Sequence, residues 1–223
     1  MPTKTIVCLA NSFRPGGSCV AGIEIIQGQF DGWIRPISHR ADQAINYAEK
    51  TLDDGSSLSV LDIIEIAFDE HRPEHHQTEN WLITEGSRWR KVGQMAPSDL
   101  LPAVLPSTTR LWRPTSSTYT GQNDEVPAFF ARRLANSLAL VRPTAATIDV
   151  SFNPHGNKNE VWVSFGWAGT QHKMKLTDPI QFARFNTAVG ARHTLNHPFL
   201  CISLAHVWEQ RGTASKLVAG LIE

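Results

Sequence analysis

Residues 4–38 read KTIVCLANSFRPGGSCVAGIEIIQGQFDGWIRPIS, and this stretch carries most of the information about the fold. Two apolar runs flank a turn that contains Pro15, Gly16 and Gly17. Pro at the second position and Gly at the third are typical of a type II turn, because the third position requires a positive φ. The stretch therefore predicts two strands joined by a tight turn, followed by a compact element at residues 33–36.

Similar strand signals recur along the rest of the chain. Runs rich in Val, Ile, Phe and Trp, bounded by Gly, Pro, Asn and Asp, are typical of half-buried strands. The predicted strands are residues 5–10, 19–26, 33–37, 60–68, 137–141, 147–152, 160–167, 172–176, 199–204 and 216–222. Helical signals are few and short. They predict a helix at 41–50, one capped turn at 97–101, and a helix at 182–189 after the capping residue Asp178 and Pro179.

The clearest alternation lies in VWVSFGW, residues 161–167. Alternate residues of a strand point to opposite faces, so one face would carry Val161, Val163, Phe165 and Trp167. Trp162 then lies on the other face. A short turn containing Gly169 predicts a hairpin with the next strand, in which Lys173 and Lys175 would share a face opposite to the apolar side chains.

The region between 94 and 135 is rich in Pro, Ser and Thr, and its periodicity is weak. It predicts a connecting segment between two β-rich halves, residues 1–93 and 136–223, each close to the size of a small barrel or sandwich domain. The expected fold class is mainly β, with two small barrels and few short helices. A single large sandwich is the structural alternative.

Composition limits the function classes. The 223 residues carry no formal net charge, so no field of the whole molecule attracts nucleic acid or anionic lipid, and any such binding requires a local patch. The longest apolar run carries Asp62 and Glu65, which argues against a membrane span, and the first residues are too polar for a signal peptide. We expect a cytoplasmic protein without a membrane partner.

Three cysteines, Cys8, Cys19 and Cys201, lie in apolar contexts and in no metal-like spacing. Buried thiols are the simplest interpretation. A disulfide between Cys8 and Cys19 across the first hairpin is the alternative, and it would need an oxidising compartment.

The first turn is one candidate ligand site. Successive backbone N–H groups at Gly16 and Gly17 can form an anion-binding nest, and Arg14 adds a positive charge beside them. The alternative interpretation is a tight hairpin with an exposed arginine.

Aromatic residues beside basic ones form the second candidate surface. Trp33 and Arg35 would share one face of a strand that ends or lies at an edge near Pro36, and Arg40 follows closely. A base stacked on an indole with its phosphate held by arginine suits this pair. The alternative places Trp33 in the core and Arg35 in an internal salt bridge.

A further cluster combines Trp81 with Arg88 and Lys91, which flank Trp89. Aromatic residues interleaved with basic ones are a modest signal for nucleic-acid binding. We therefore expect these residues as neighbours of the same patch.

Enzymatic patterns are weak. The histidines His71, His75 and His76 surround Pro73, which would interrupt a helix that aligned them, so a solvated loop is favoured over a metal site. We predict no metal, no cofactor and no catalytic residue. A weaker alternative is an enzyme acting on a nucleotide through His39 with Ser12 or Cys19.

Several blocks together resemble the dual OB-containing domain family of bacterial proteins. They are KTIVCLANSFRPGG-CVAG, GWIRPIS, VLDI, QTENW, GQND, SLALV, LTDP, CISL and KLVAGLI, in this order over nearly the whole chain. In the first block the chain has Ser18 where the family pattern leads us to expect a second basic residue after the glycines.

The resemblance implies two OB-like β-barrels packed as one compact unit. It also implies an association with prokaryotic conflict or antiviral systems and recognition of single-stranded nucleic acid or a nucleotide without catalysis. The alternative is a scaffold subunit of such a system, in which the tryptophans would anchor a protein partner.

Overall fold

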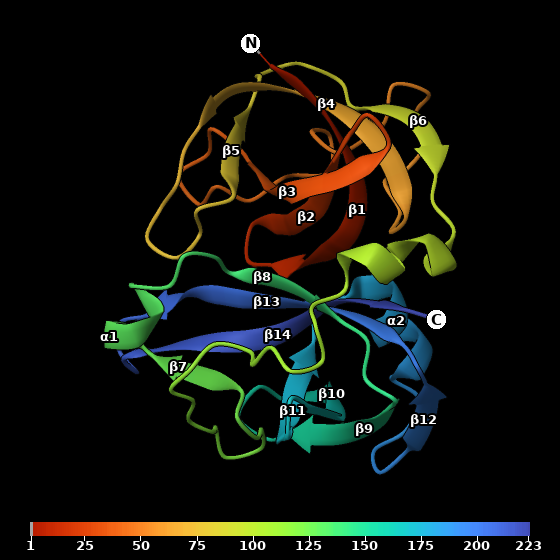
Figure 1. Cartoon of the computed structure of the whole chain (residues 1–223). Helices are drawn as coiled ribbons and strands as arrows, with labels where there is room; N and C mark the ends of the chain where they lie inside the picture. Colours follow the sequence, from red (N-terminus) through yellow and green to blue (C-terminus); the bar gives the residue numbers. More distant parts are fainter. Residues whose placement is uncertain (1) are drawn as a thin grey trace. The chain divides into compact units, whose positions relative to one another are not determined.

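The computed structural model describes residues 2–223 and divides into two compact units, Met1–Ala103 and Val104–Glu223. Each unit is built on its own β-sheet, and the helices are few and short (Figure 1). The mainly β fold expected from the sequence is confirmed. The division between the units falls inside the predicted connecting segment, residues 94–135.

The first unit contains a six-stranded sheet in the order β1-β2-β3-β5-β4-β6. Its strands are β1 (Thr3–Arg14), β2 (Gly17–Ile26), β3 (Gln29–Ile37), β4 (Asp62–His71), β5 (Asn80–Ile83) and β6 (Arg90–Gln94). β1 also pairs with β4, so the first five strands form a closed circuit. Neighbours in the circuit are antiparallel except for β3 and β5, which are parallel. This is a five-stranded OB-like barrel.

The first hairpin has the predicted tight turn, with Gly16 at a φ of 85°. The register sets Cys8 opposite Gly22 rather than opposite Cys19, so the alternative of a disulfide between the two cysteines is wrong. Both cysteines, like Cys201, carry thiols.

The core of the first unit follows the alternation of its strands. Inward-facing side chains from β1 to β5 meet Trp89 and three side chains from the long connection between β3 and β4. The cluster consists of Ile6, Cys8, Val20, Ile34, Ile45, Leu52, Leu58, Ile64, Ile66, Phe68, Ile83 and Trp89. This connection includes the predicted helix at 41–50, and that prediction is wrong. Residues 41–50 form turns, because Gln43 has a φ of 56° and Ile45 exchanges backbone hydrogen bonds with Ser18.

The second unit contains a sheet in the order β12-β9-β10-β11-β14-β13-β8, with β7 paired to β14. Its strands are β7 (Glu125–Pro127), β8 (Leu138–Val141), β9 (Ala145–Asn153), β10 (Lys158–Trp167), β11 (Thr170–Leu176), β12 (Arg192–Asn196), β13 (Phe199–Trp208) and β14 (Thr213–Ile222). Its short helices are α1 (Ala128–Ala131) and α2 (Pro179–Phe185). Asp178 caps α2 by accepting bonds from the Ile180 and Gln181 amides, as the sequence predicts.

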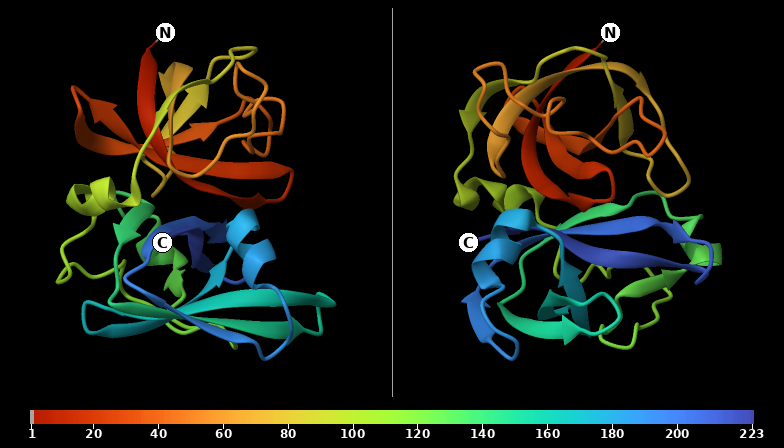
Figure 2. Two further views of the ribbon diagram at one scale, coloured as in Figure 1. Left: turned by 90° about the vertical axis from the view of Figure 1, so that its right-hand side faces the viewer. Right: turned by 180° about the vertical axis from the view of Figure 1, so that it is seen from behind.

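The five central strands of this sheet repeat the order of the first barrel. β9, β10, β11, β14 and β13 correspond to β1, β2, β3, β5 and β4, and β11 pairs in parallel with β14 as β3 does with β5. Figure 2 shows the long ribbon that β9 and β10 form. The chain therefore contains two OB-like barrels of the same strand order, and the second is partly open because no ladder joins β9 to β13 among residues 2–223.

The predicted hairpin of β10 and β11 is present, with its turn at Ala168 and Gly169, both at positive φ. Alternate side chains of both strands are buried in the core, among them Val163 and Met174. Trp162 points to the opposite face, directly across from Lys175. This face bears the features described next.

Candidate functional site

The structure separates the residues that the sequence groups into one patch. Arg35 is buried, and its guanidinium lies 3.2 Å from the Glu79 carboxylate, which is also buried. The interpretation of Arg35 as an internal salt bridge therefore replaces the expectation of an exposed binding group. Trp33 on β3 is half-buried and pairs across the ladder with Ile23.

Three of the predicted residues, Arg14, Gly16 and Arg40, lie near Asp42 at the first turn. A Cβ atom at Gly16 would lie 2.0 Å from the Asp42 carboxylate, and one at Gly17 would lie 2.4 Å from the Ile45 carbonyl. Arg40 forms a 3.3 Å ion pair with Asp42. Bonds from Arg40 and the Ala44 amide, with the charge of Arg14 adding to them, lower the pKa of Asp42. The positive groups of this turn thus already surround an anion of the protein itself.

A further basic group reaches this region from a distant position. The ammonium of Lys50 donates to Ser18 Oγ at 2.6 Å and to Asn11 Oδ1 at 2.8 Å, and burial lowers its pKa. The family pattern leads us to expect a basic residue directly after the glycines, at the position of Ser18. In this chain the ammonium of Lys50 lies there instead, bound to the Ser18 hydroxyl.

The remaining predicted residues lie in separate settings. Trp81 packs beside Phe68 and His71, with the Lys4 ammonium 4.3 Å from its ring centroid. Lys91 on β6 forms a 2.5 Å ion pair with the buried Asp62. Arg88 is exposed in the turn before β6. Their partners differ, and their contacts do not link them into one cluster.

The side chains of the enzymatic alternative are also engaged elsewhere. His39 Nε2 lies 3.1 Å from Asp69 and 3.0 Å from the Ile83 carbonyl, while Ser12 donates to the Cys19 carbonyl. Among the histidines, His71 bonds to the carbonyl of Thr78 at 2.6 Å.

A pocket of about 480 Å³ lies on the outer face of the second barrel. Its floor comes from the centre of the sheet, with Trp162 and Glu160 on β10, Lys175 on β11 and Lys216 on β14. The size falls within the range of small-molecule sites. Because Trp162 is nearly buried although it points away from the core, the walls of the pocket cover this part of the sheet.

The floor combines an indole with hydrogen-bonded charges. Glu160 Oε1 accepts from Lys175 at 2.6 Å and from Asn153 at 2.9 Å. Burial acts to raise the pKa of Glu160, but these bonds outweigh it, and the pKa is lowered. The Lys173 ammonium lies 5.9 Å from the centroid of Trp162. The floor therefore combines a nearly buried indole with fixed cations beside it.

Lys216 is buried at the back of this pocket. Its ammonium donates to the Trp112 carbonyl and to Thr115 Oγ1, each at 3.1 Å. Burial, opposed in part by the charge of Asp124, lowers the pKa of Lys216 to about 8.

One wall is a strap formed by residues 115–124. Asp124 accepts from the amide and hydroxyl of Thr118 and leaves no room for a side chain at Gly121. The strap joins the sheet where the Lys216 amide donates to the Asp124 carbonyl and where Gln122 exchanges backbone bonds with Lys173. Tyr119 lines the pocket at the strap and is fully exposed.

The rim comes from two loops. His155 lies in the connection between β9 and β10, while Trp208 and Arg211 lie at the connection between β13 and β14. Trp208 is 54% exposed, and the Arg211 guanidinium lies 5.5 Å from its ring centroid.

The model of a known family, described as the dual OB-containing domain, matches residues 4–221. The chain belongs to this family. No curated protein matches this chain. A crystal structure of the tetrameric p202 HIN2 is similar at 11% identity and a TM-score of 0.30, covering 97% of this chain and 87% of that one. Among residues 2–223, no helix has the length and apolar character needed to cross a membrane.

OB barrels bind their ligands on the face of their second and third strands and on the loops that join strands one to two and four to five. In the second barrel of this dual OB-containing domain these are β10, β11, the connection that contains His155 and the one that contains Arg211. The pocket therefore lies on the face that corresponds to the ligand face of other OB barrels.

Sequence reasoning missed this site, although part of the signal was present. The predicted alternation sets Trp162 and Lys175 opposite to the apolar side chains of their strands, and the observed register pairs the two residues directly. The strap and Arg211 come from distant segments whose approach no local pattern indicates.

Proposed function

We propose that the pocket of the second barrel binds single-stranded nucleic acid or a nucleotide, without catalysis. The observation that carries this proposal is the cross-strand pair of Trp162 and Lys175 in the floor of a pocket on the OB ligand face. Aromatic surfaces stack bases of any sequence, and nearby cations hold the phosphates. As the family resemblance implies, the module would act in a prokaryotic conflict or antiviral system.

The local charge supports the proposal although the whole chain is neutral. Lys175 and Arg211 line the pocket together with two carboxylates, Asp124 and Glu160, while the ammonium of Lys216 is buried and bonded to Trp112 and Thr115. Both carboxylates already accept hydrogen bonds from the protein. Arg211 is half-exposed at the rim, so a ligand phosphate can reach it with little desolvation.

The test is fluorescence anisotropy of the full chain with a labelled dodecathymidylate and with labelled ATP. We expect Lys175→Gln and Trp162→Leu each to weaken binding of the preferred probe by about 1–3 kcal/mol, or roughly 5- to 150-fold. Affinity should fall with added salt, because phosphate contacts release counterions. Thermal melting of each variant would verify that it is folded, and Trp162→Phe should retain most of the affinity.

Arg192→Gln is the matched control, because Arg192 is an exposed cation on β12 that does not line the pocket. It should bind within twofold of the wild type. Absence of binding to both probes, or wild-type affinity in folded Lys175→Gln and Trp162→Leu, would contradict the proposal.

The first barrel supplies a second set of candidate residues. Arg14, Gly16, Gly17 and Arg40 form one locus, and Trp33, Trp81, Arg88 and Lys91 lie around the rest of this barrel. We propose that they contribute less than the pocket, because their contacts do not gather them in one place, whereas Trp162 and Lys175 are direct cross-strand neighbours. The variant Arg88→Ala/Lys91→Ala measures how much the first barrel contributes to the binding affinity. A loss of affinity larger than that of Lys175→Gln would place the main site on the first barrel.

A further inference from the structure

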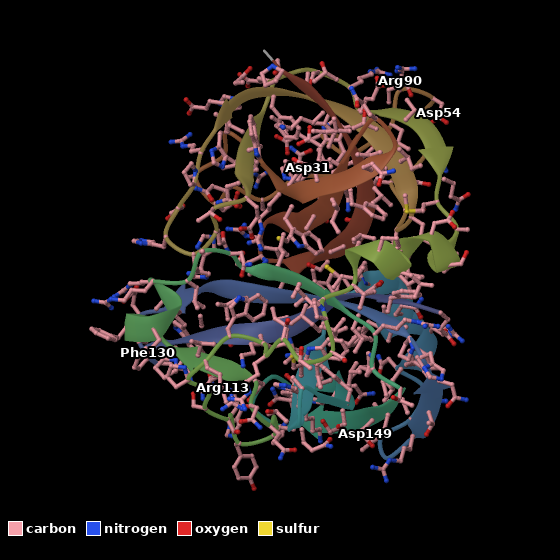
Figure 3. The ribbon with its side chains drawn as sticks, viewed as in Figure 1. Asp31, Asp54, Arg90, Arg113, Phe130 and Asp149 are labelled. Atoms are coloured by element: carbon pink, nitrogen blue, oxygen red, sulfur yellow. The ribbon has the colours of Figure 1, made fainter. Side chains whose placement is uncertain are left out.

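A group of exposed aromatic and basic side chains lies beside the pocket, around the short helix α1. We call Phe129, Phe130, Arg133, Trp208 and Arg211 the α1 patch. Phe129 and Phe130 are 60% and 43% exposed, and their rings make an edge-to-face contact at 5.2 Å. The Arg133 guanidinium lies 3.6 Å from the centroid of Phe129. Figure 3 labels Phe130 at the outer end of α1.

The patch is continuous with the pocket. Trp208 and Arg211 belong to both, because they line the pocket rim and lie in the same turn that contacts α1. The Ala128 amide donates to the Gly212 carbonyl at 2.8 Å, and Arg132 forms an ion pair with Glu209 at 2.5 Å. These bonds fix α1 against the β13–β14 turn, which carries Trp208 and Arg211.

From this continuity we propose that the ligand is a strand of several nucleotides, which leaves the pocket past Trp208 and Arg211 and crosses the α1 patch. The inference rests on the proposed function and names the substrate class within it. An isolated nucleotide would use the pocket alone and would leave the patch without a role.

The chemistry of the patch favours this occupant. Two arginines, Arg133 and Arg211, lie over its rings, and the acidic residue at the turn, Glu209, is paired with Arg132. Guanidinium groups stacked on aromatic rings present both a flat apolar surface and phosphate donors. Extended tracks of this kind bind successive nucleotides with little dependence on sequence. Exposed apolar side chains gathered at one place generally mark such an interaction site.

The test compares ligand lengths. Fluorescein-labelled oligothymidylates of 2, 4, 8 and 12 nucleotides are titrated with the full chain and with Phe129→Ser/Arg133→Ser. The wild type should bind the 12-mer at least tenfold more tightly than the dinucleotide. The variant should lose most of this gain and still bind the dinucleotide within twofold of the wild type, because the pocket is intact.

Ile180→Ser/Arg184→Ser is the matched control. It removes an exposed apolar residue and an arginine from the other short helix of the same unit, α2. This control should keep the length dependence of the wild type.

Each remaining outcome is decisive. If no oligonucleotide binds, both the proposed function and this inference fall. If all lengths bind equally and the pocket variants abolish binding, the function stands and the strand path is wrong. If the patch variant keeps the affinity for the 12-mer but changes a dimer to a monomer in analytical ultracentrifugation, the patch joins copies of this chain, and the inference is overturned.

Discussion

Arg35 and Glu79 form a buried ion pair in the first barrel, with 3.2 Å between the guanidinium and the carboxylate and side chains that are 2% and 4% exposed. The Arg35 amide also donates to the Glu79 carbonyl at 2.8 Å. The pair joins β3 to the loop before β5, at the point where these parallel strands begin to pair. The arginine that the sequence offers as a ligand contact thus stabilises the strand junction.

Replacing Arg35 tests this structural role. Arg35→Met should lower the free energy of unfolding by about 3–5 kcal/mol, because it leaves the Glu79 carboxylate buried without its counter-charge. Urea denaturation at pH 7 measures the loss. The double variant Arg35→Met/Glu79→Leu should recover most of it, since replacing both charges removes the unpaired group. If the Arg35→Met protein is as stable as the wild type but binds oligonucleotides more weakly, Arg35 contacts the ligand and its structural role is contradicted.

Gly16 should be the least tolerant of the exposed turn glycines. Gly16→Ala combines a positive φ of 85° with a clash against the Asp42 carboxylate. The left-handed conformation alone costs a non-glycine residue about 1–2 kcal/mol. Gly55→Ala is the matched control, because Gly55 has a φ of 81° and no atom within 4 Å of the new Cβ. Differential scanning fluorimetry should give a larger drop in Tm for Gly16→Ala, and equal drops would mean that Asp42 does not press on the turn.

The buried Lys216 should make stability rise with pH on the alkaline side. Its pKa in the folded chain, about 8, lies below the ordinary 10.5, so the unfolded chain binds more protons between pH 8 and 10.5. Stability contributed by this group is therefore lowest below pH 8 and increases through that window, by about 3 kcal/mol at most. Urea denaturation at pH 7.5, 8.5 and 9.5 measures the trend.

Lys216→Met separates this contribution from the titration of other groups. The difference between the unfolding free energies of the wild type and the variant should grow in favour of the wild type as pH rises. A difference that stays constant from pH 7.5 to 9.5 would show that Lys216 is not desolvated in the folded chain.

The buried His172 should make stability fall with decreasing pH on the acid side. Burial, together with the charge of Lys216, lowers the pKa of His172 from 6.5 to about 4, and the ring stacks on Phe165 at 5.4 Å. The unfolded chain therefore binds more protons between pH 6.5 and 4, and stability falls as pH decreases through this window. His172→Gln should lose part of that pH dependence when unfolding is followed at pH 7, 5.5 and 4.5. If the unfolding free energy of His172→Gln depends on pH as that of the wild type does, the pKa of His172 is not lowered in the folded chain.

The strands were predictable because their physics is local. The alternation around Trp162 identifies β10, and the glycine turn that follows fixes the register with β11. Strands β5, β6, β7 and β12 were missed because they have only three to five residues each. The false helix at 41–50 arose because local propensity cannot anticipate that Ile45 bonds to the backbone of Ser18.

The site was harder to predict than the fold because it depends on distant segments. Basic and aromatic residues close together in sequence pointed to the first barrel, where Arg35 is buried and Lys91 is paired. In the second barrel the relevant side chains come from the strap, two strands and the β13–β14 turn. The family resemblance supplied the topology but not which of the two barrels carries the pocket.

Asp42 lies against the first turn, so its carboxylate competes with any external anion for the positive groups of that turn. Any external phosphate that approaches Arg40 and Gly16 must displace a carboxylate already held there by the fold, at an effective concentration in the millimolar range or above. A glycine-rich turn with a flanking arginine can thus have the appearance of a vacant anion receptor and yet be occupied from within. Whether such a motif captures phosphate depends on one acidic side chain outside it.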